Sequence, residues 1–194
     1  MVRVSCKYTY ARVPSIVITL LLAMGGATFA ADLSAPHVRN FDRVNDHLFR
    51  SGEPSVEGLA ELGAMGVKTV IDLRESGAAT QFEKEQVEKL HMKYINVPFA
   101  QLSAPKQAQM EQVLSLLLND SGPILVHCRR GKDRTGTVIA CYRIQHDGWN
   151  NERALQEAKE HGLSFAERGM RSYILHFSSL SLPVAHPSVA LSKP

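Results

Sequence analysis

Short apolar segments rich in β-branched residues alternate along this chain with stretches of helical periodicity. The segments VKTVIDL (67–73), KYINVPF (93–99) and PILVH (123–127) each have the length of one buried strand. Strand–helix–strand alternation with short connections is typical of a parallel sheet that helices cover on both faces. We therefore predict one α/β domain with a central parallel-type sheet flanked by helices, over residues 40–180.

Apolar spacing predicts the helices of this domain. One helix between the first two strands is marked by Phe82, Val87 and Leu90. The next shows the i, i+3, i+4, i+7 pattern of a buried helix face at Met110, Val113, Leu114 and Leu117. Apolar side chains surround the helix after PILVH, which is therefore expected to be central and buried: Val138, Ile139, Cys141, Tyr142 and Ile144.

Weaker patterns complete the domain at both ends. HLFRSG (47–52) is expected to be an edge strand, and residues 54–65 a helix that Gly66 ends. Two further helices are expected around 151–161 and 165–180. The inward side of the last is predicted from Met170, Tyr173, Ile174 and Phe177.

The two ends of the chain do not have the pattern of a folded domain. Arg3, Lys7 and Arg12 precede an apolar run over 16–29, and small residues follow it, which is typical of a signal peptide (1–30) cleaved after Ala30. The alternative is an uncleaved membrane anchor over 14–31, just short of a comfortable span. Residues 31–39 then form a linker, and the proline-rich tail 181–194 is expected to be disordered. We expect an exported, periplasmic protein, with membrane contact only if the leader stays uncleaved.

Charge excludes a general nucleic-acid-binding surface. The formal charge of +3 belongs to residues 1–31, which hold three Lys/Arg and no Asp/Glu, so the remainder has as many acidic as basic groups. A basic surface that coats nucleic acid is therefore not expected, and any effect of the cations must be local.

Residues 128–134 lie between the end of a predicted central strand and the start of the buried helix. Ligands of open α/β sheets collect at the carboxyl ends of strands, and a helix N-terminus favours an anion. Gly131 allows the loop to curl with its N–H groups inward, and Arg134 supplies a fork that matches phosphate oxygens. The same groups would lower the pKa of the Cys128 thiol, and Thr135 could donate to its sulfur. A thiolate beside a bound phosphate is a nucleophile.

Here the chain resembles the cysteine-dependent phosphatases, whose signature is His-Cys, five residues, Arg and then Ser or Thr. It reads His-Cys-Arg-Arg-Gly-Lys-Asp-Arg-Thr-Gly over 127–136. NFDRVNDHLFRSGEPS and VIDLRE are similar to the leading segments of the compact, atypical dual-specificity phosphatases of plants, fungi and bacteria. The resemblance implies the protein tyrosine phosphatase fold, Cys128 as nucleophile, Arg134 as phosphate clamp, the 129–133 backbone as cradle, and neither cofactor nor metal.

The proton donor that this resemblance implies is missing from its usual place. The family usually supplies an Asp from a loop after the preceding strand, but VPFAQLSAP (97–105) contains neither Asp nor Glu. Asp133 is our substitute, because some bacterial and lipid phosphatases of similar sequence carry Gly-Lys-Asp-Arg-Thr-Gly and this Asp is assigned the role of proton donor in them. The alternative is that Asp133 only pairs with Arg130 or Lys132.

Substrate contacts are expected from Arg129, Arg130, Gly131, Lys132 and Thr135 around the cradle. Arg74 could also bind substrate or could pair with Glu75 or another local carboxylate, and the sequence leaves this open. His47, His91 and His161 lack the spacing of metal ligands. Cys141 is expected to be a core residue that forms no disulfide with Cys128.

Three functions remain open. Hydrolysis of phosphoprotein, tyrosine first, is favoured. The crowded cations would also suit an inositol polyphosphate or pyrophosphate. A non-catalytic module that binds phosphorylated ligands is the alternative of a different class. A nucleotide-binding loop is disfavoured because the segment lacks the Gly-x4-Gly-Lys-Ser/Thr pattern, and a rhodanese-like sulfur carrier because it would not need the Arg-Thr-Gly start of the helix.

Overall fold

The computed structural model describes residues 35–120 and 122–182. The predicted signal peptide, the alternative anchor over 14–31, residues 31–34 of the predicted linker and the tail from residue 183 lie outside the described residues. Within the described part of the chain, no helix is both long and apolar enough to cross a membrane.

One five-stranded sheet forms the centre of the described residues, in the order β1-β2-β5-β3-β4. Its strands are β1 (Asp42–Arg43), β2 (Leu48–Ser51), β3 (Thr69–Asp72), β4 (Lys93–Asn96) and β5 (Ile124–His127). β5 pairs in parallel with both β2 and β3, and β4 in parallel with β3, whereas the short β1 is antiparallel to β2. This arrangement confirms the predicted α/β class with a mainly parallel sheet.

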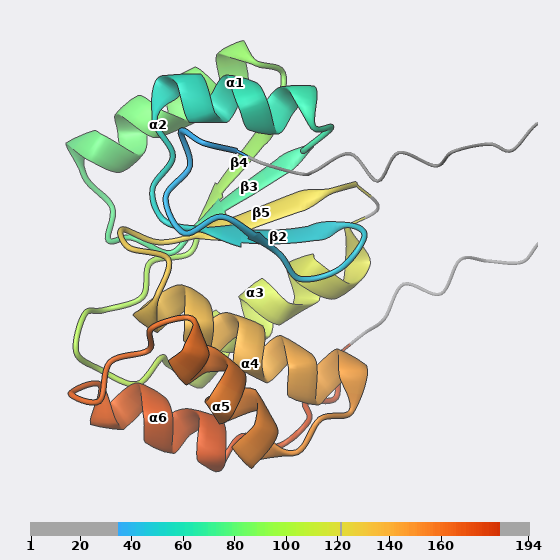
Figure 1. Cartoon of the computed structure of the whole chain (residues 1–194), viewed down its shortest axis with the longest axis vertical. Helices are drawn as coiled ribbons and strands as arrows, with labels where there is room; N and C mark the ends of the chain where they lie inside the picture. The colour runs from blue at the N-terminus through green and yellow to red at the C-terminus, as the bar shows by residue number, and fades with distance from the viewer. Residues whose placement is uncertain (1–34, 121, 183–194) are drawn as a thin grey trace, which may run out of the picture. The chain divides into compact units, whose positions relative to one another are not determined.

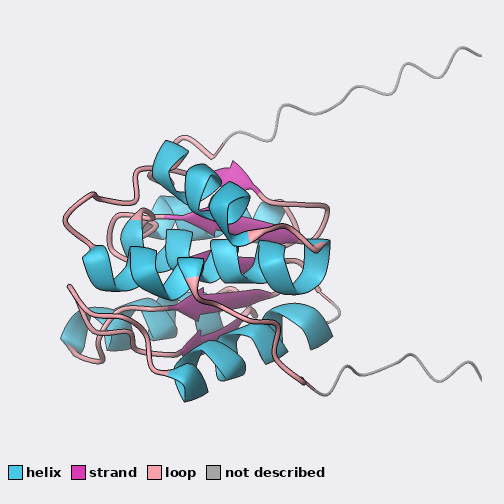
Figure 2. Cartoon of the chain, turned by 90° about the horizontal axis from the view of Figure 1, so that it is seen from below, coloured by secondary structure: helices cyan, strands magenta, loops and turns pink. Residues whose placement is uncertain are grey.

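Helices cover both faces of the sheet (Figures 1 and 2). They are α1 (Val56–Ala64), α2 (Ala78–Lys89), α3 (Gln107–Asn119), α4 (Asp133–Asp147), α5 (Asn151–Glu160) and α6 (Arg168–Leu175). In Figure 1, α1 and α2 lie on one side of the strands, and α3, α4, α5 and α6 lie on the other.

Alternation along each strand explains the two apolar cores. Val70 and Leu125 pack with α1 and α2, whereas Ile71 and Val126 pack with the helices of the opposite face. Successive side chains of a strand point to opposite faces. Because both faces are covered, the strands are apolar throughout rather than at every second residue.

The two best-patterned helices agree with the predictions. The α3 side chains Met110, Val113, Leu114 and Leu117 are all buried, as are all five apolar side chains named for α4. α4 is therefore the central helix of its layer. Its N-terminus directly follows the loop at the end of β5 and so fixes where that loop opens.

Three details differ from the predictions. β2 is internal, because the two-residue strand β1, too short and polar to recognise, covers its outer side. Phe82 is 55% exposed, and α2 instead turns Thr80, Glu83 and Val87 inward. α6 covers only 168–175, and Phe177 is buried just beyond its end.

Candidate active site

The loop that follows β5 lies at the carboxyl edge of the sheet. β5 ends at His127 and α4 begins at Asp133, so residues 128–132 join a central strand directly to a helix N-terminus. Both neighbours of β5 are parallel to it and end at the same edge. Free N–H groups of the first helical turn and the positive end of the helix dipole therefore face the loop.

Gly131 gives this loop its curvature. Its φ of +72° lies in the left-handed region, and a Cβ added here would lie 2.4 Å from the Gly52 nitrogen and 2.5 Å from the Ser51 carbonyl carbon. These contacts are backbone atoms at the end of β2 that no rotamer change could move. Only glycine fits this close approach.

Three successive carbonyls of the loop are bound from outside. Those of Arg129, Arg130 and Gly131 accept hydrogen bonds from the Glu53 N–H (3.3 Å), the Asn40 side chain (2.6 Å) and the Arg50 guanidinium (3.2 Å). In a planar trans peptide the C=O and the following N–H point in opposite directions. The N–H groups of residues 130–132 are therefore turned to the inner side of the loop, as an anion cradle requires.

The Cys128 thiol is buried and electrostatically activated. Burial acts to raise the pKa of Cys128, but the hydroxyl and N–H of Thr135, the charge of Arg134 and the N–H of Gly131 outweigh it, so that the pKa is lowered. The Thr135 hydroxyl is itself buried, with no other hydrogen-bond partner among the described residues. The environment therefore favours a thiolate, the reactive form of cysteine.

The Arg134 guanidinium is held in place by the ends of the neighbouring strands. Its Nη1 donates to the carbonyls of Leu73 (3.3 Å) and Phe99 (3.4 Å), which follow β3 and β4. The side chain is nearly buried, and it lines the same pocket as Cys128. A guanidinium fixed in this way presents its remaining donors in one orientation, which suits bidentate binding of phosphate.

A pocket of about 420 Å³ opens over the thiol. Its charged lining comprises four arginines and two carboxylates: Arg39, Arg129, Arg130, Arg134, Asp133 and Glu167. Gln101, Leu102 and Met170 line the rest. The excess of guanidinium groups over carboxylates favours an anionic ligand directly above Cys128.

Asp133 lies in this pocket, but its carboxylate already has partners. Oδ1 accepts the backbone N–H of Ser164 at 2.9 Å, and Oδ2 lies 3.9 Å from Arg130 Nη2. Asp133 thus connects the first turn of α4 to the segment between α5 and α6. This is close to the ion-pair alternative left open by the sequence.

Lys132 is the loop cation that does not line the pocket. Its side chain lies against Gly162, where an added Cβ would be 3.0 Å from Lys132 Cδ, and it borders a separate hollow. Lys132 therefore contributes its backbone N–H to the cradle, while its side chain points away from the pocket over Cys128.

Arg74 is likewise absent from the pocket lining. The guanidinium donates to Asp72 (Nη2–Oδ2 2.7 Å) and Glu83 (Nη2–Oε2 2.6 Å), and also pairs with Glu53. Of the two alternatives for Arg74, the structure has the salt bridge with local carboxylates, and substrate binding is not supported. The sequence suggested Glu75 as the ion-pair partner of Arg74. The carboxylates that pair with it instead come from three different segments of the chain.

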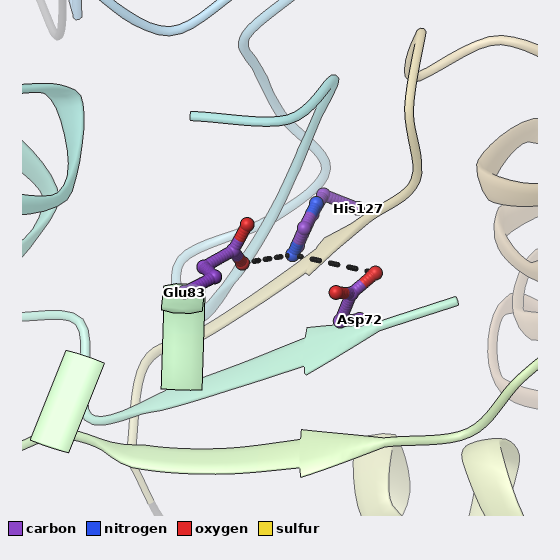
Figure 3. Close-up of side chains that lie close together, drawn as sticks. All are labelled: Asp72, Glu83 and His127. Atoms are coloured by element: carbon purple, nitrogen blue, oxygen red, sulfur yellow. Dashed lines mark ion pairs between the residues drawn. The ribbon is translucent and has the colours of Figure 1, made fainter. Parts of the chain in front are cut away.

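His127 belongs to this buried cluster rather than to the loop (Figure 3). Its Nε2 lies 2.7 Å from Glu83 Oε1 and 3.9 Å from Asp72 Oδ1. Asp72, Glu83 and His127 each present one potential metal-ligand atom, all within 4.8 Å of one another. However, Arg74 donates to both carboxylates, so a cation would compete with a guanidinium already paired there. We interpret the cluster as an ion-pair network.

Several pocket residues were not predicted from the sequence. Arg39 lies in a segment interpreted as linker, and Gln101 and Leu102 lie in the stretch where the acid was sought. Glu167 lies beside Asp133, 34 residues later in the chain, and no motif marks it. Cys141 behaves as expected: it is buried, and both it and Cys128 are free thiols.

Known proteins match both the sequence and the fold. Residues 35–173 match the family model described as DSP-PTPase phosphatase fused to NAD+ Kinase. The dual specificity protein phosphatase TpbA of Pseudomonas aeruginosa is 28% identical in an alignment 170 residues long, which covers 78% of this chain and 75% of the relative. The inositol diphosphatase DSP5 of Arabidopsis thaliana is 30% identical over 152 residues, covering 74% and 72%.

The solved structures include TpbA of P. aeruginosa, as a cysteine-to-serine variant in complex with pTyr. It superposes with a TM-score of 0.61 at 27% identity and covers 75% of this chain and 86% of that one. This similarity agrees with the fold that the sequence predicts.

Proposed function

Because the chain belongs to the DSP-PTPase phosphatase family, we propose that it hydrolyses phosphate monoesters through a phosphocysteine intermediate on Cys128. The observation that carries this proposal is the loop itself, in which a buried thiol with a lowered pKa lies at the floor of an arginine-lined pocket. The family and both relatives have the names of phosphatases, which favours turnover over a non-catalytic binding module.

In the first step, the Cys128 thiolate attacks the phosphorus of the bound monoester. The phosphate oxygens accept hydrogen bonds from the N–H groups of the loop and from Arg134, so the charge that spreads over them in the transition state is stabilised. The bond from phosphorus to the leaving oxygen breaks as the bond from sulfur to phosphorus forms. Water then releases phosphate and restores the thiolate.

The leaving oxygen needs a proton, which we assign to a carboxyl group of the pocket. Asp133 is the candidate from the sequence, and its position in the pocket supports it. Glu167 is the second carboxyl at hand. The residues in this mechanism have the roles of nucleophile (Cys128), clamp (Arg134) and cradle (129–133), with Thr135 beside the sulfur.

The substrate we favour is a phosphoprotein, phosphotyrosine first. TpbA is named a dual specificity protein phosphatase, and its structure in complex with pTyr has the same fold. The second candidate is an inositol polyphosphate or pyrophosphate. It is supported by the name of the Arabidopsis relative and by the three further arginines that line the pocket with Arg134.

A turnover assay tests this function. The purified chain and its Cys128→Ser variant receive p-nitrophenyl phosphate under reducing conditions, and hydrolysis by the wild type alone is expected. Phosphate binding without turnover in either protein would instead identify a binding module. Comparison of phosphotyrosine peptide with inositol hexakisphosphate then ranks the two substrates by kcat/KM.

For localisation, we propose export to the periplasm with removal of residues 1–30, on the pattern of the leader and the bacterial relative TpbA. Cell fractionation and N-terminal sequencing of the mature protein would test it. A chain that stays in the membrane fraction with an intact N-terminus would instead indicate the anchor over 14–31.

A further inference from the structure

The reaction needs a proton donor, and the usual segment cannot provide one. Residues 97–105, which follow β4, contain no Asp or Glu. In the pocket over Cys128, the carboxyl groups among the lining residues are those of Asp133 and Glu167. The choice of proton donor is therefore between the carboxyl group of Asp133 and that of Glu167.

The Asp133 carboxylate has a structural task. Its Oδ1 accepts the Ser164 N–H, which fixes the segment between α5 and α6 against the first turn of α4. Its Oδ2 faces Arg130 at 3.9 Å. Donation to a leaving group would require this carboxylate to exchange partners during the reaction.

The Glu167 carboxyl lacks such partners. Glu167 precedes α6 at the N-cap position, yet its side chain makes no capping hydrogen bond. The residue is only 7% exposed, and Oε2 is buried with no hydrogen-bond partner among the described residues. A buried oxygen without a partner costs free energy, about 1–3 kcal/mol for a typical polar group. That cost is removed when a substrate oxygen enters the pocket and pairs with it.

The surroundings of Glu167 also favour its protonated form. Burial and then the charge of Asp133 raise the pKa of Glu167, and Arg130 and Arg134 oppose this shift without cancelling it. A carboxyl group that keeps its proton more readily than an exposed glutamate is a better donor near neutral pH. Asp133 thus acts on Glu167 through its negative charge as well as by holding the adjacent segment.

We infer that Glu167, on the segment leading into α6, is the general acid of this phosphatase, with Asp133 as its positioning residue. The inference rests on the proposed function, because it needs Cys128 to be the nucleophile. It replaces the assignment of the acid to Asp133 and uses a residue outside both the loop after β5 and the usual acid loop.

The proton balance of the two steps is simple. When the Cys128 sulfur attacks, the electron pair of the broken phosphorus–oxygen bond goes to the leaving oxygen, which takes the proton of the Glu167 carboxyl. The Glu167 carboxylate then accepts a proton from the water that attacks phosphocysteine. The electron pair of the sulfur–phosphorus bond returns to sulfur, which restores the thiolate and the protonated Glu167.

Leaving-group dependence tests the assignment in the full chain. Phenyl phosphate has a basic leaving group that needs a proton, whereas p-nitrophenyl phosphate has an acidic one that needs it much less. Glu167→Gln is expected to lower kcat/KM about 100-fold with phenyl phosphate and less than about tenfold with p-nitrophenyl phosphate. Asp133→Asn, the matched variant in the same pocket, is expected to show the same leaving-group dependence with a smaller loss, because Asp133 acts on the proton transfer only through Glu167.

A control variant, two tests of folding and a second substitution at position 167 accompany this experiment. Glu152→Gln, on the exposed side of α5, should match the wild type with both substrates. Circular dichroism and binding of inorganic phosphate report whether each variant folds. If Glu167→Gln does not fold, Glu167→Asp serves instead, and it should lose more activity with phenyl phosphate than with p-nitrophenyl phosphate.

Equal losses with both substrates in Glu167→Gln would overturn the assignment, as would a leaving-group-dependent loss confined to Asp133→Asn. Failure of the proposed function itself looks different: the wild type would not turn over, or Cys128→Ser would be as active as the wild type, whatever residue stands at 167.

Discussion

His127 and Cys128 are neighbours in the sequence, but their side chains belong to opposite faces of the sheet. His127 Nε2 lies 2.7 Å from Glu83 Oε1 of α2, whereas Cys128 packs in the core shared by α3, α4, α5 and α6. The thiol and the buried ion-pair network are thus separated by the strand from which both residues extend. The network can therefore support the end of β5 without contacting the substrate.

Removal of one partner tests how much this network stabilises the fold. Glu83→Gln removes the carboxylate that pairs with both His127 and Arg74, although Arg74 keeps Asp72 and Glu53. Breaking a buried pair of this kind costs about 3–5 kcal/mol. We expect the free energy of unfolding, measured with urea, to fall by this amount. Glu85→Gln, on the exposed side of the same helix, should change it by less than about 0.5 kcal/mol. Similar values for the two variants would contradict the account of the network.

The same network predicts a dependence of stability on pH. Burial acts to lower the pKa of His127, but the charge of Glu83 and its contact with the imidazole outweigh burial and raise that pKa. The folded state therefore binds this proton more tightly than the unfolded state. The contribution is fully present below the unfolded pKa of about 6.5 and is lost as pH rises through the folded value.

Urea unfolding at a series of pH values would measure this effect. The difference in stability between the wild type and Glu83→Gln is expected to shrink as pH rises above neutrality. A difference that stays constant or grows with pH would contradict a charged imidazole paired with Glu83 in the folded protein.

Alanine substitutions at two glycines with similar backbone conformations distinguish the effect of backbone strain on stability from the effect of the loop on phosphate binding. Gly131 (φ +72°) and Gly148 (φ +67°) are both left-handed, but an added Cβ meets the backbone of β2 only at Gly131 and open space at Gly148. Gly148→Ala is expected to cost about 1–2 kcal/mol of stability and to keep phosphate binding. Gly131→Ala should lose phosphate binding because the loop must move away from Gly52. Isothermal titration with inorganic phosphate compares them, and equal affinities would contradict the account of the cradle.

Cysteine alkylation measures the ionisation state of the Cys128 thiol. Because the surroundings lower the pKa of Cys128, its reaction with iodoacetamide should show a midpoint below the value of about 8.5 for a free cysteine. Thr135→Ala is expected to move this midpoint upward. Cys141, whose pKa burial raises, serves as the internal reference, and peptide mapping distinguishes the two. A midpoint that Thr135→Ala leaves unchanged would show that the hydroxyl does not act on the sulfur.

The sequence predicted local features more successfully than long-range ones. The loop after β5 and the buried α4 could be recognised because one short segment contains both the cysteine signature and the apolar side chains that follow it. β1 could not, because it is two exposed polar residues long. The inward face of α2 could not, because Glu83 pairs with Arg74, just after β3, and with His127 at the end of β5. A glutamate in an amphipathic helix normally predicts an exposed face.

The candidate site shows the same division. Cys128, Arg134 and the cradle lie within seven residues, and the structure brings them to one pocket. Arg39 and Glu167 reach that pocket from the two ends of the domain, so only the folded chain reveals them. Arg74, by contrast, was a candidate for substrate binding because it follows a predicted strand. In the structure it pairs with three carboxylates and does not line the pocket.

Direct detection of the covalent intermediate tests the central claim. The full chain is mixed with radiolabelled phosphotyrosine peptide, quenched rapidly in acid, digested and mapped. The account predicts label on the peptide that contains Cys128 in the wild type and none in Cys128→Ser. Label on another residue, or steady hydrolysis by Cys128→Ser at the wild-type rate, would contradict it.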